Sequence, residues 1–255
     1  MTAATAPVAR RVEHVMGLPI GLALRGRHAA GPAADAAWAA VLASLREADR
    51  VFSTYRADSV VRRIDRGELG LDDAPAEVHE VLAIAARAAR TTDGAFSVWR
   101  DGRLDPSGVV KGWAVQRASA LLRDLPDTDV CLSAGGDLVA WSDTVPWHVG
   151  IEDPRDPTRL VATVPVTDGA VASSGTAHRG AHLVDARTGA APTGIAGVTV
   201  LAGSLTDADV DATAAYALGR DALSWLRRRV GRTGLVVWAD GTAAPFGEAL
   251  GRSPA

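Results

Sequence analysis

Hydrophobic residues in the first hundred positions recur at the three- and four-residue spacing of amphipathic helices. Residues 32–53 show this spacing and predict a long helix. Residues 72–94 predict a second helix, with Asp73 as a candidate N-cap, Pro75 near the first turn and Gly94 just beyond the last turn. The N-terminal half of the chain is therefore expected to supply helices that pack through one apolar face.

The pattern then changes to short β-branched runs that are separated by glycine, proline and aspartate, which is typical of strands. An earlier run, residues 11–26, is also strand material and is broken at 17–19. Too little chain lies between the later runs for crossover helices, so we expect mainly antiparallel pairing. These later strand runs are residues 129–141, 146–154, 159–175, 197–203 and 233–241.

Two further helical segments complete the pattern, one following the glycine turn near residue 108 and one or two within residues 206–231. Helices early, strands in the middle and a helix late predict an α+β fold, with helices packed on mainly antiparallel strands. We expect a single domain over residues 11–255. The small and polar residues 1–10 are expected to be disordered.

Composition excludes several classes of protein. A net charge of −3 and an isoelectric point near 6.1 give no broad basic face, so we expect no nucleic-acid partner. The one cysteine, Cys131, rules out an internal disulfide framework and is expected to be a buried core thiol. Because we find no export signal and no apolar stretch of membrane-spanning length, we expect a cytoplasmic protein without membrane insertion.

The chain contains a single lysine, Lys111, among 27 lysine and arginine residues. Asp105, Gly108 and Lys111 are three residues apart, so a turn that runs into a helix would place them on one side. An ammonium beside the free N–H groups of a helix N-terminus suits a phosphate group. The alternative is a solvent-exposed lysine, the usual situation of this residue.

Three aspartates, Asp207, Asp209 and Asp211, precede Thr213 in a helical segment. Asp209 and Thr213 are four residues apart and share a helix face. A carboxylate and a hydroxyl, with other positions left to phosphate and water, are typical ligands of Mg²⁺. The alternative is that Thr206, Asp207 or Asp209 caps the helix.

Two histidines, His178 and His182, follow the ASSG stretch, and Asp185 comes three residues after the second. A histidine can take a proton from a hydroxyl, and a nearby carboxylate can orient it, although either histidine could equally be a surface residue. No G-x-S-x-G motif is present, which argues against a hydrolase triad. Residues 135–136 fail the dinucleotide-binding fingerprint and predict a tight turn whose backbone lies against a ligand or another strand.

Nine short motifs follow one another between roughly residues 12 and 219. They are VMGLPI, FSTYRADS, TDGAF, DPSGVVKG, LSAGGDL, VGIEDP, ASSG, HLVDARTG and DADVDATAAYALG. Each motif is weak by itself, but their order is specific. Together they resemble the ApbE family of FAD:protein FMN transferases, which implies a T-fold-like domain of the ApbE type.

The resemblance implies Mg²⁺-dependent transfer of FMN from FAD to a threonine or serine hydroxyl of an acceptor protein with an FMN-binding domain, releasing AMP. Mn²⁺ is the alternative metal. The residues that the resemblance places around FAD are Met16, Tyr55, Ala95, Phe96, Ser97, Asp105, Lys111 and Leu183.

The same resemblance implies a metal site formed by the Gly108 carbonyl, the Asp209 carboxylate and the Thr213 hydroxyl. His182, with Asp185 completing its H-x-x-D motif, would be the base that activates the acceptor hydroxyl.

The sequence departs from the family pattern at three places. Ser97 stands where aspartate is common, the stretch from Gly94 to Asp105 is short, and Ala186 replaces a common proline. None of these changes removes a metal ligand or the lysine, so we expect catalysis with altered affinity for FAD. Two alternative functions stay open: a metal-dependent FAD pyrophosphatase that yields FMN and AMP, and an FAD-binding protein without turnover.

Overall fold

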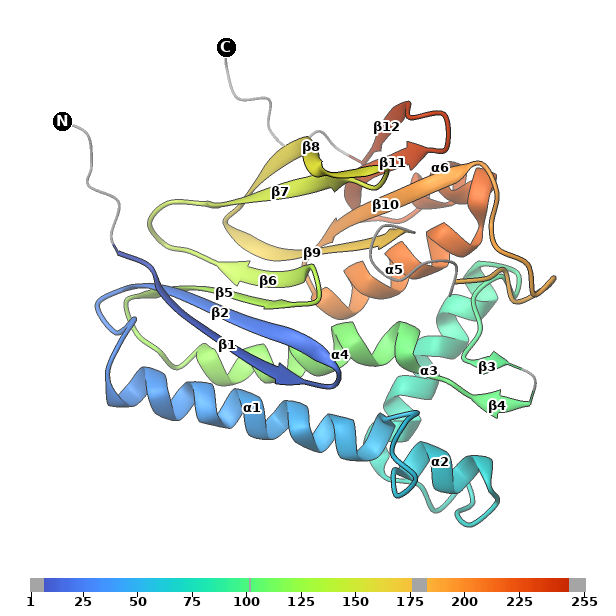
Figure 1. Cartoon of the computed structure of the whole chain (residues 1–255), viewed down its shortest axis with the longest axis horizontal. Coiled ribbons are helices and arrows are strands. Elements are labelled where there is room, and N and C mark those ends of the chain that lie inside the picture. The colour runs from blue at the N-terminus through green and yellow to red at the C-terminus, as the bar shows by residue number, and fades with distance from the viewer. Residues whose placement is uncertain (1–6, 101, 176–182, 248–255) are drawn as a thin grey trace.

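The computed structural model, which describes residues 7–100, 102–175 and 183–247, is built on an eight-stranded sheet (Figure 1). The spatial order is β1-β2-β5-β6-β9-β10-β11-β12, and each neighbouring pair is antiparallel. The bounds are β1 (Ala9–Val15), β2 (Leu18–Gly26), β5 (Thr128–Ala134), β6 (Asp137–Trp141), β9 (Asp168–Gly175), β10 (Ile195–Ala202), β11 (Thr233–Trp238) and β12 (Ala243–Phe246).

Four further strands form two hairpins outside this sheet. The short pair β3 (Trp99–Arg100) and β4 (Arg103–Leu104) precedes a helix, whereas β7 (Trp147–Asp153) and β8 (Asp156–Val166) form a longer hairpin. A small apolar cluster joins the longer hairpin to the main sheet. It contains Ile151, Val164 and Val166 from the hairpin and Ala140, Val171 and Leu201 from the sheet.

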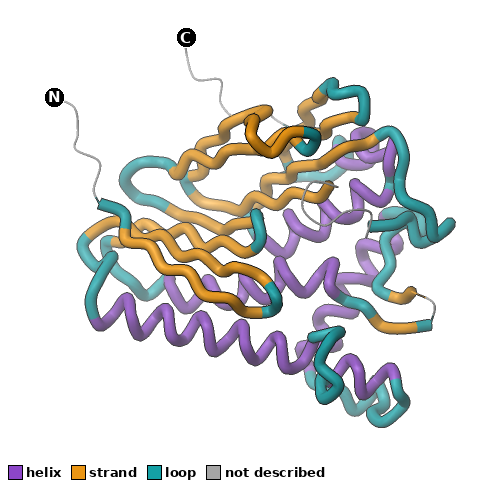
Figure 2. Tube along the Cα trace, viewed as in Figure 1, coloured by secondary structure: helices purple, strands orange, loops and turns teal. Residues whose placement is uncertain are grey.

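The helices lie largely on one face of the sheet, as Figure 2 shows by colour. They are α1 (Pro32–Phe52), α2 (Val60–Asp65), α3 (Ala76–Thr91), α4 (Ser107–Ser119), α5 (Leu205–Ala217) and α6 (Ala222–Leu226), with 3-10 turns η1 (Ala120–Leu122) and η2 (Gly219–Asp221). None of these described helices combines the length and apolar character that a membrane span requires.

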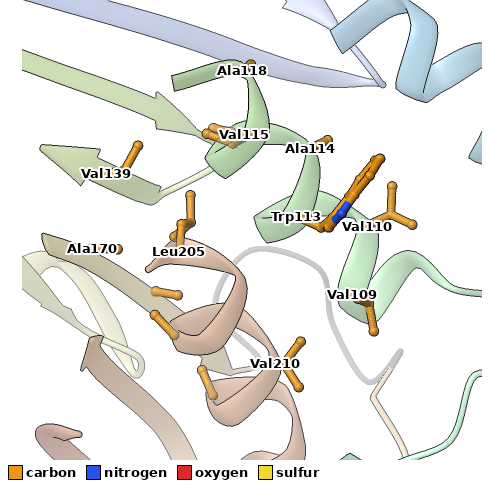
Figure 3. Close-up of a cluster of buried hydrophobic side chains, with 14 of the residues drawn as sticks. Val109, Val110, Trp113, Ala114, Val115, Ala118, Val139, Ala170, Leu205 and Val210 are labelled. Atoms are coloured by element: carbon orange, nitrogen blue, oxygen red, sulfur yellow. The ribbon is translucent and has the colours of Figure 1, made fainter. Parts of the chain in front are cut away.

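The hydrophobic core fixes α4 between its neighbours. Trp113 and Val115 of α4 are both buried. Val115 lies near Val139 of β6 and Leu205 of α5, whereas Trp113 points away from them (Figure 3). The Trp113 ring meets that of Phe52 edge-on, with 5.3 Å between the ring centroids. Each large apolar side chain buried here contributes about 1.5–3 kcal/mol, so the position of α4 is strongly determined.

The fold predicted from the sequence is confirmed: antiparallel strands dominate and helices pack on them. The antiparallel runs and both long helices lie where the hydrophobic pattern indicated. Gly94 ends α3 as expected, with a φ of +83° and its N–H donating to the Ala89 carbonyl at 2.9 Å.

Several local predictions were wrong. The first hairpin turns at Met16 and Gly17, both with positive φ, rather than at 17–19. Pro75, not Asp73, is the N-cap of α3. Strand β1 starts at Ala9, inside the segment expected to be disordered, and the short elements α2, β3 and β4 were not predicted.

Helices α4 and α5 approach each other closely at Gly112. A Cβ there would lie 2.6 Å from the Asp209 Cβ and 2.7 Å from the Leu205 carbonyl oxygen. We therefore expect Gly112→Ala to lower the free energy of unfolding by about 1–3 kcal/mol, because the extra methyl group forces the helices apart. In an uncrowded helix the same change would stabilise by roughly 1 kcal/mol. Urea denaturation shows whether the substitution lowers or raises the free energy of unfolding.

Gly203 provides the matched control for this substitution. It lies just before α5, and a Cβ added there meets no heavy atom within 4 Å. Gly203→Ala should leave stability unchanged or slightly increased. A Gly112→Ala protein as stable as the Gly203→Ala protein would contradict the close helix approach.

Candidate active site

A large open cavity of about 1090 Å³ lies where the β1–β2 turn, the end of α1, the loop before β3 and the start of α4 come together. It contains every residue that the sequence resemblance places around FAD. These are Met16, Tyr55, Ala95, Phe96, Ser97, Asp105, Lys111 and Leu183. Segments far apart in the sequence thus contribute to one cavity, and its volume lies slightly above the range of about 300–1,000 Å³ that is typical of small-molecule sites.

Backbone and side-chain hydrogen bonds hold the Ala95–Phe96 part of this cavity. The Thr92 hydroxyl accepts a bond from the Phe96 N–H at 3.1 Å, and the Ala186 N–H donates to the Ala95 carbonyl at 2.9 Å. The second bond joins the loop after α3 to the segment after Leu183. The two walls of the cavity are therefore fixed relative to each other at this point.

Two aromatic side chains stand at the solvent-exposed rim. Tyr55 is 98% exposed and Trp99 is 45% exposed, which is unusual for large apolar residues. Ser97 stabilises the turn beside Trp99, because its hydroxyl accepts from the Trp99 N–H at 3.0 Å and donates to the Trp99 carbonyl at 3.1 Å. Ser97, which stands where aspartate is common in the family, therefore serves to hold this turn.

A second, smaller cavity of about 200 Å³ adjoins the large one. It lies between the β5–β6 turn, strands β7, β9 and β10, and the first turn of α4. Both cavities share the lining residues Ser107, Gly108, Lys111, Leu183 and Thr213. At this junction of the two cavities, three of the shared residues, Gly108, Lys111 and Thr213, are those that the sequence predicts to bind phosphate or metal.

Lys111 lies between two buried carboxylates at this junction. Its ammonium contacts Oδ2 of Asp137 and lies 3.1 Å from Oδ1 of Asp209. The Lys111 side chain is 17% exposed and those of Asp137 and Asp209 are 1% and 2% exposed. The alternative of a solvent-exposed lysine is therefore wrong.

The two carboxylates are each held by a backbone N–H group. The Gly112 N–H donates to Oδ2 of Asp209 at 2.8 Å, and the Ser173 N–H donates to Oδ1 of Asp137 at 3.0 Å. These bonds fix Asp209 on α5 against α4 and Asp137 against β9. The cluster is thus oriented from three separate elements.

Burial and neighbouring charges both shift the pKa values of Lys111 and Asp137. Burial lowers the pKa of Lys111, but the negative charges of Asp209 and Asp137 outweigh it and raise that pKa above its ordinary value. Burial raises the pKa of Asp137, and the nearby charge of Asp209 raises it further, although Lys111 opposes both. Lys111 is therefore held as an ammonium, whereas the pKa of Asp137, raised to about 7, lets its carboxyl take up a proton more readily than an ordinary aspartate does.

Gly108 of α4 lies beside Thr213 of α5, and Asp209 is on the same helix as Thr213; the role of these three residues as metal ligands stays a prediction. Asp209 and Thr213 are one turn apart on α5, and a Cβ on Gly108 would lie 3.4 Å from the Thr213 Cγ2. The Thr213 hydroxyl lies 3.3 Å from that of Ser174. This set of oxygen donors fits Mg²⁺, which takes few protein ligands and completes its shell with phosphate and water.

The described part of the chain contains no group of three or more His, Cys, Asp or Glu residues placed to hold a metal. The oxygen donors of Asp209 and Thr213 suit a cation that binds together with a phosphate ligand.

Helix capping does not explain the aspartates of α5. The N-cap is Ser204, whose hydroxyl accepts from the Asp207 N–H at 3.2 Å, so the alternative of a cap by Thr206, Asp207 or Asp209 is wrong. Asp211 points to different partners, with Arg229 at 2.9 Å and Arg232 at 2.7 Å. Asp209 is therefore the aspartate of this segment that faces the cavities.

The proposed base falls outside the described residues, as does His178. His182 immediately precedes Leu183, which lines both cavities. Asp185 pairs with Arg187 at 2.6 Å, and this bond lowers the pKa of the Asp185 carboxyl. Asp185 is not among the described residues that line either cavity. The roles of His182 and Asp185 therefore stay predictions.

Asp137 is the site residue that the sequence did not single out. Gly135 and Gly136 form the expected tight turn, with φ values of +56° and +98°, and Asp137 pairs with Ala134 directly after it. The available signal was an aspartate that enters an apolar strand immediately after two glycines. A charge in such a position is expected to be buried and paired.

The site combines an antiparallel α+β fold, a large open cavity and a buried lysine–carboxylate cluster where this cavity adjoins the smaller one. This is the architecture of a small-molecule site with a charged end, as in proteins that bind phosphorylated cofactors.

The sequence profile of the ApbE family matches residues 16–100 and 98–236, so the chain belongs to the ApbE family. A comparison with curated proteins found no match.

Solved structures that share this fold include the following three. The ApbE protein of Thermotoga maritima superposes with a TM-score of 0.83 at 21% identity, covering 94% of this chain and 97% of that one. The apo flavinyl transferase ApbE of Pseudomonas stutzeri gives 0.79 at 24% identity, with 96% of each chain covered. The flavin transferase ApbE of Vibrio cholerae gives 0.78 at 20% identity, covering 94% and 98%.

Proposed function

We propose that the protein transfers FMN from FAD to a serine or threonine hydroxyl of an acceptor flavoprotein, with Mg²⁺ required and AMP released. Membership of the ApbE family supports flavin transfer, as do the names of the similar proteins of Pseudomonas stutzeri and Vibrio cholerae. The observation that carries the proposal is the junction of the two cavities. There the large cavity ends on Lys111, Gly108 and Thr213, where a diphosphate would meet charge.

The reaction replaces one phosphate ester bond by another. The acceptor hydroxyl attacks the phosphorus on the FMN side of the diphosphate, and a new P–O bond forms. The bond from that phosphorus to the bridging oxygen breaks, so AMP leaves with this oxygen. The hydroxyl proton passes to a base, for which His182 stays the candidate.

The residues at the junction would bind and orient the diphosphate. Lys111 brings a fixed positive charge to the first turns of α4, where the positive end of the helix dipole also favours an anion. Gly108, Asp209 and Thr213 would hold a divalent cation, Mg²⁺ or Mn²⁺. When bound, that cation would neutralise charge that develops on the phosphoryl oxygens.

The rest of the large cavity would receive the flavin and the adenosine. The exposed rings of Tyr55 and Trp99 offer aromatic surface at the rim, which suits contact with a planar ring system. The cytoplasm is the expected compartment, since a chain with one cysteine suits a reducing environment.

A single incubation separates this function from its two alternatives. Purified protein, FAD and Mg²⁺ are combined with an FMN-binding acceptor domain, and acceptor mass, in-gel flavin fluorescence and AMP are followed. We expect covalent FMN on the acceptor, one AMP per label, and no reaction with EDTA. Free FMN and AMP with an unlabelled acceptor would instead identify an FAD pyrophosphatase. Bound and intact FAD would identify a binding protein.

A further inference from the structure

Asp137 is a buried aspartate at the start of a strand, where neither cofactor binding nor strand pairing requires a carboxylate. It is the first residue of β6, its side chain is 1% exposed, and the Ser173 N–H of β9 fixes its Oδ1. Its Oδ2 is thereby directed at the Lys111 ammonium. Both carboxylate oxygens are thus committed to groups of the chain itself, so Asp137 acts through Lys111.

Lys111 and a divalent cation would compete for Asp209. The ammonium lies 3.1 Å from Oδ1 of Asp209, the carboxylate expected to bind the metal. A cation held at that oxygen repels a second cation that approaches it, most strongly in a buried site where solvent screens little. Lys111 beside Asp209 alone would therefore weaken metal binding.

Asp137 affects both the position of the Lys111 ammonium and the net charge of the three groups. With Asp137 present and all three groups ionised, one ammonium faces two carboxylates and the charges sum to −1; without Asp137 they sum to zero. We propose that Asp137 is a positioning residue that draws the Lys111 ammonium away from Asp209 and leaves a net negative charge for a divalent cation. The inference rests on the metal site of the proposed function.

The inference predicts effects of opposite sign for the two partners. Asp137→Asn keeps the shape and the bond from Ser173 but leaves Lys111 on Asp209 alone, so metal affinity should fall by about 10- to 100-fold. Lys111→Met removes the competing cation, so metal affinity should rise above that of the wild type. The double variant again sums to −1 and should return toward the wild type. Glu152 also lines the small cavity, but its charge is the same in every variant.

Mn²⁺ binding to the purified protein without FAD measures these effects, with the free Mn²⁺ followed by electron paramagnetic resonance. FAD affinity is measured separately by flavin fluorescence. For Lys111→Met the two readouts should move in opposite directions, with tighter Mn²⁺ binding and weaker FAD binding. A residue that only supported the fold would not produce this divergence.

Asp129→Asn is the matched control. Asp129 lies in the same β5–β6 hairpin, its side chain is 3% exposed, and it pairs with Arg25 at 2.8 Å. It is not among the described residues that line either cavity. This variant should lose stability in thermal unfolding but bind Mn²⁺ as the wild type does.

Equal Mn²⁺ affinity of wild type and Asp137→Asn would overturn the inference alone. Weaker binding by Lys111→Met would also overturn it, and this variant decides the question even if Asp137→Asn does not fold. A wild-type protein that binds no Mn²⁺ either without FAD or in its presence would overturn the metal site of the proposed function together with the inference.

Discussion

Replacing Asp209 with alanine is expected to lower the rate of FMN transfer by about a thousandfold or more. The change removes the only carboxylate of the proposed metal site and one of the two carboxylates that face Lys111. Loss of a single charge-stabilising group at a transition state typically costs a hundred- to a thousandfold, and here two such contributions would be lost. Acceptor labelling in single-turnover experiments with saturating FAD and Mg²⁺ measures the effect.

Two asparagine substitutions on the same helix separate chemistry from folding. Asp209→Asn keeps an oxygen for the Gly112 N–H, so it should fold normally and still lose transfer. Asp211→Asn removes an equally buried carboxylate that pairs with Arg229 and Arg232 on the other side of α5. It should lose about 1–3 kcal/mol of stability and keep its labelling rate. Wild-type labelling by the Asp209→Asn protein would refute the assignment.

The hydrophobic pattern predicted the helices and strands of this fold better than it predicted how they are arranged. Each strand run carries its own alternation and turn residues, so its position along the chain could be predicted locally. The neighbour relation of β6 and β9 could not, because the whole β7–β8 hairpin is inserted between them in the sequence. Such pairing depends on which faces pack together in three dimensions.

Short elements escaped prediction for a related reason. Helix α2 has six residues, too few for a periodic signal, and it depends on Ser59, which caps it and also donates to the Ser53 carbonyl. The hairpin β3–β4 has two residues on each side. Elements of this length are stabilised by contacts with the rest of the molecule rather than by their own pattern.

The candidate site likewise contains residues that local sequence patterns could predict and one that they could not. Motif order predicted a set of residues that the structure brings to one cavity, and the four-residue spacing of Asp209 and Thr213 put both on one face of α5. Asp137 was missed because its significance depends on a contact with Lys111, which a different element supplies. A buried ion pair between distant segments leaves no spacing signal in one sequence.

Lys111→Arg is expected to reduce FAD affinity or transfer by about a hundredfold, although it preserves the charge. The Lys111 ammonium fits between Asp137 and Asp209 in a nearly closed space. A guanidinium is larger, planar and suited to bidentate pairing with one carboxylate, so it would move from this central position. Displacement of a phosphate-binding group by about 1 Å is enough for a loss of this size.

Flavin fluorescence titration and single-turnover labelling measure the two components of this loss. Arg117→Lys is the matched control, since it makes the reverse exchange on the same helix at an exposed position beside Trp113. It should bind FAD and label the acceptor as the wild type does. If the Lys111→Arg protein did the same, a point charge would not be required at this position. The single lysine in a chain that otherwise uses arginine would then need a different explanation.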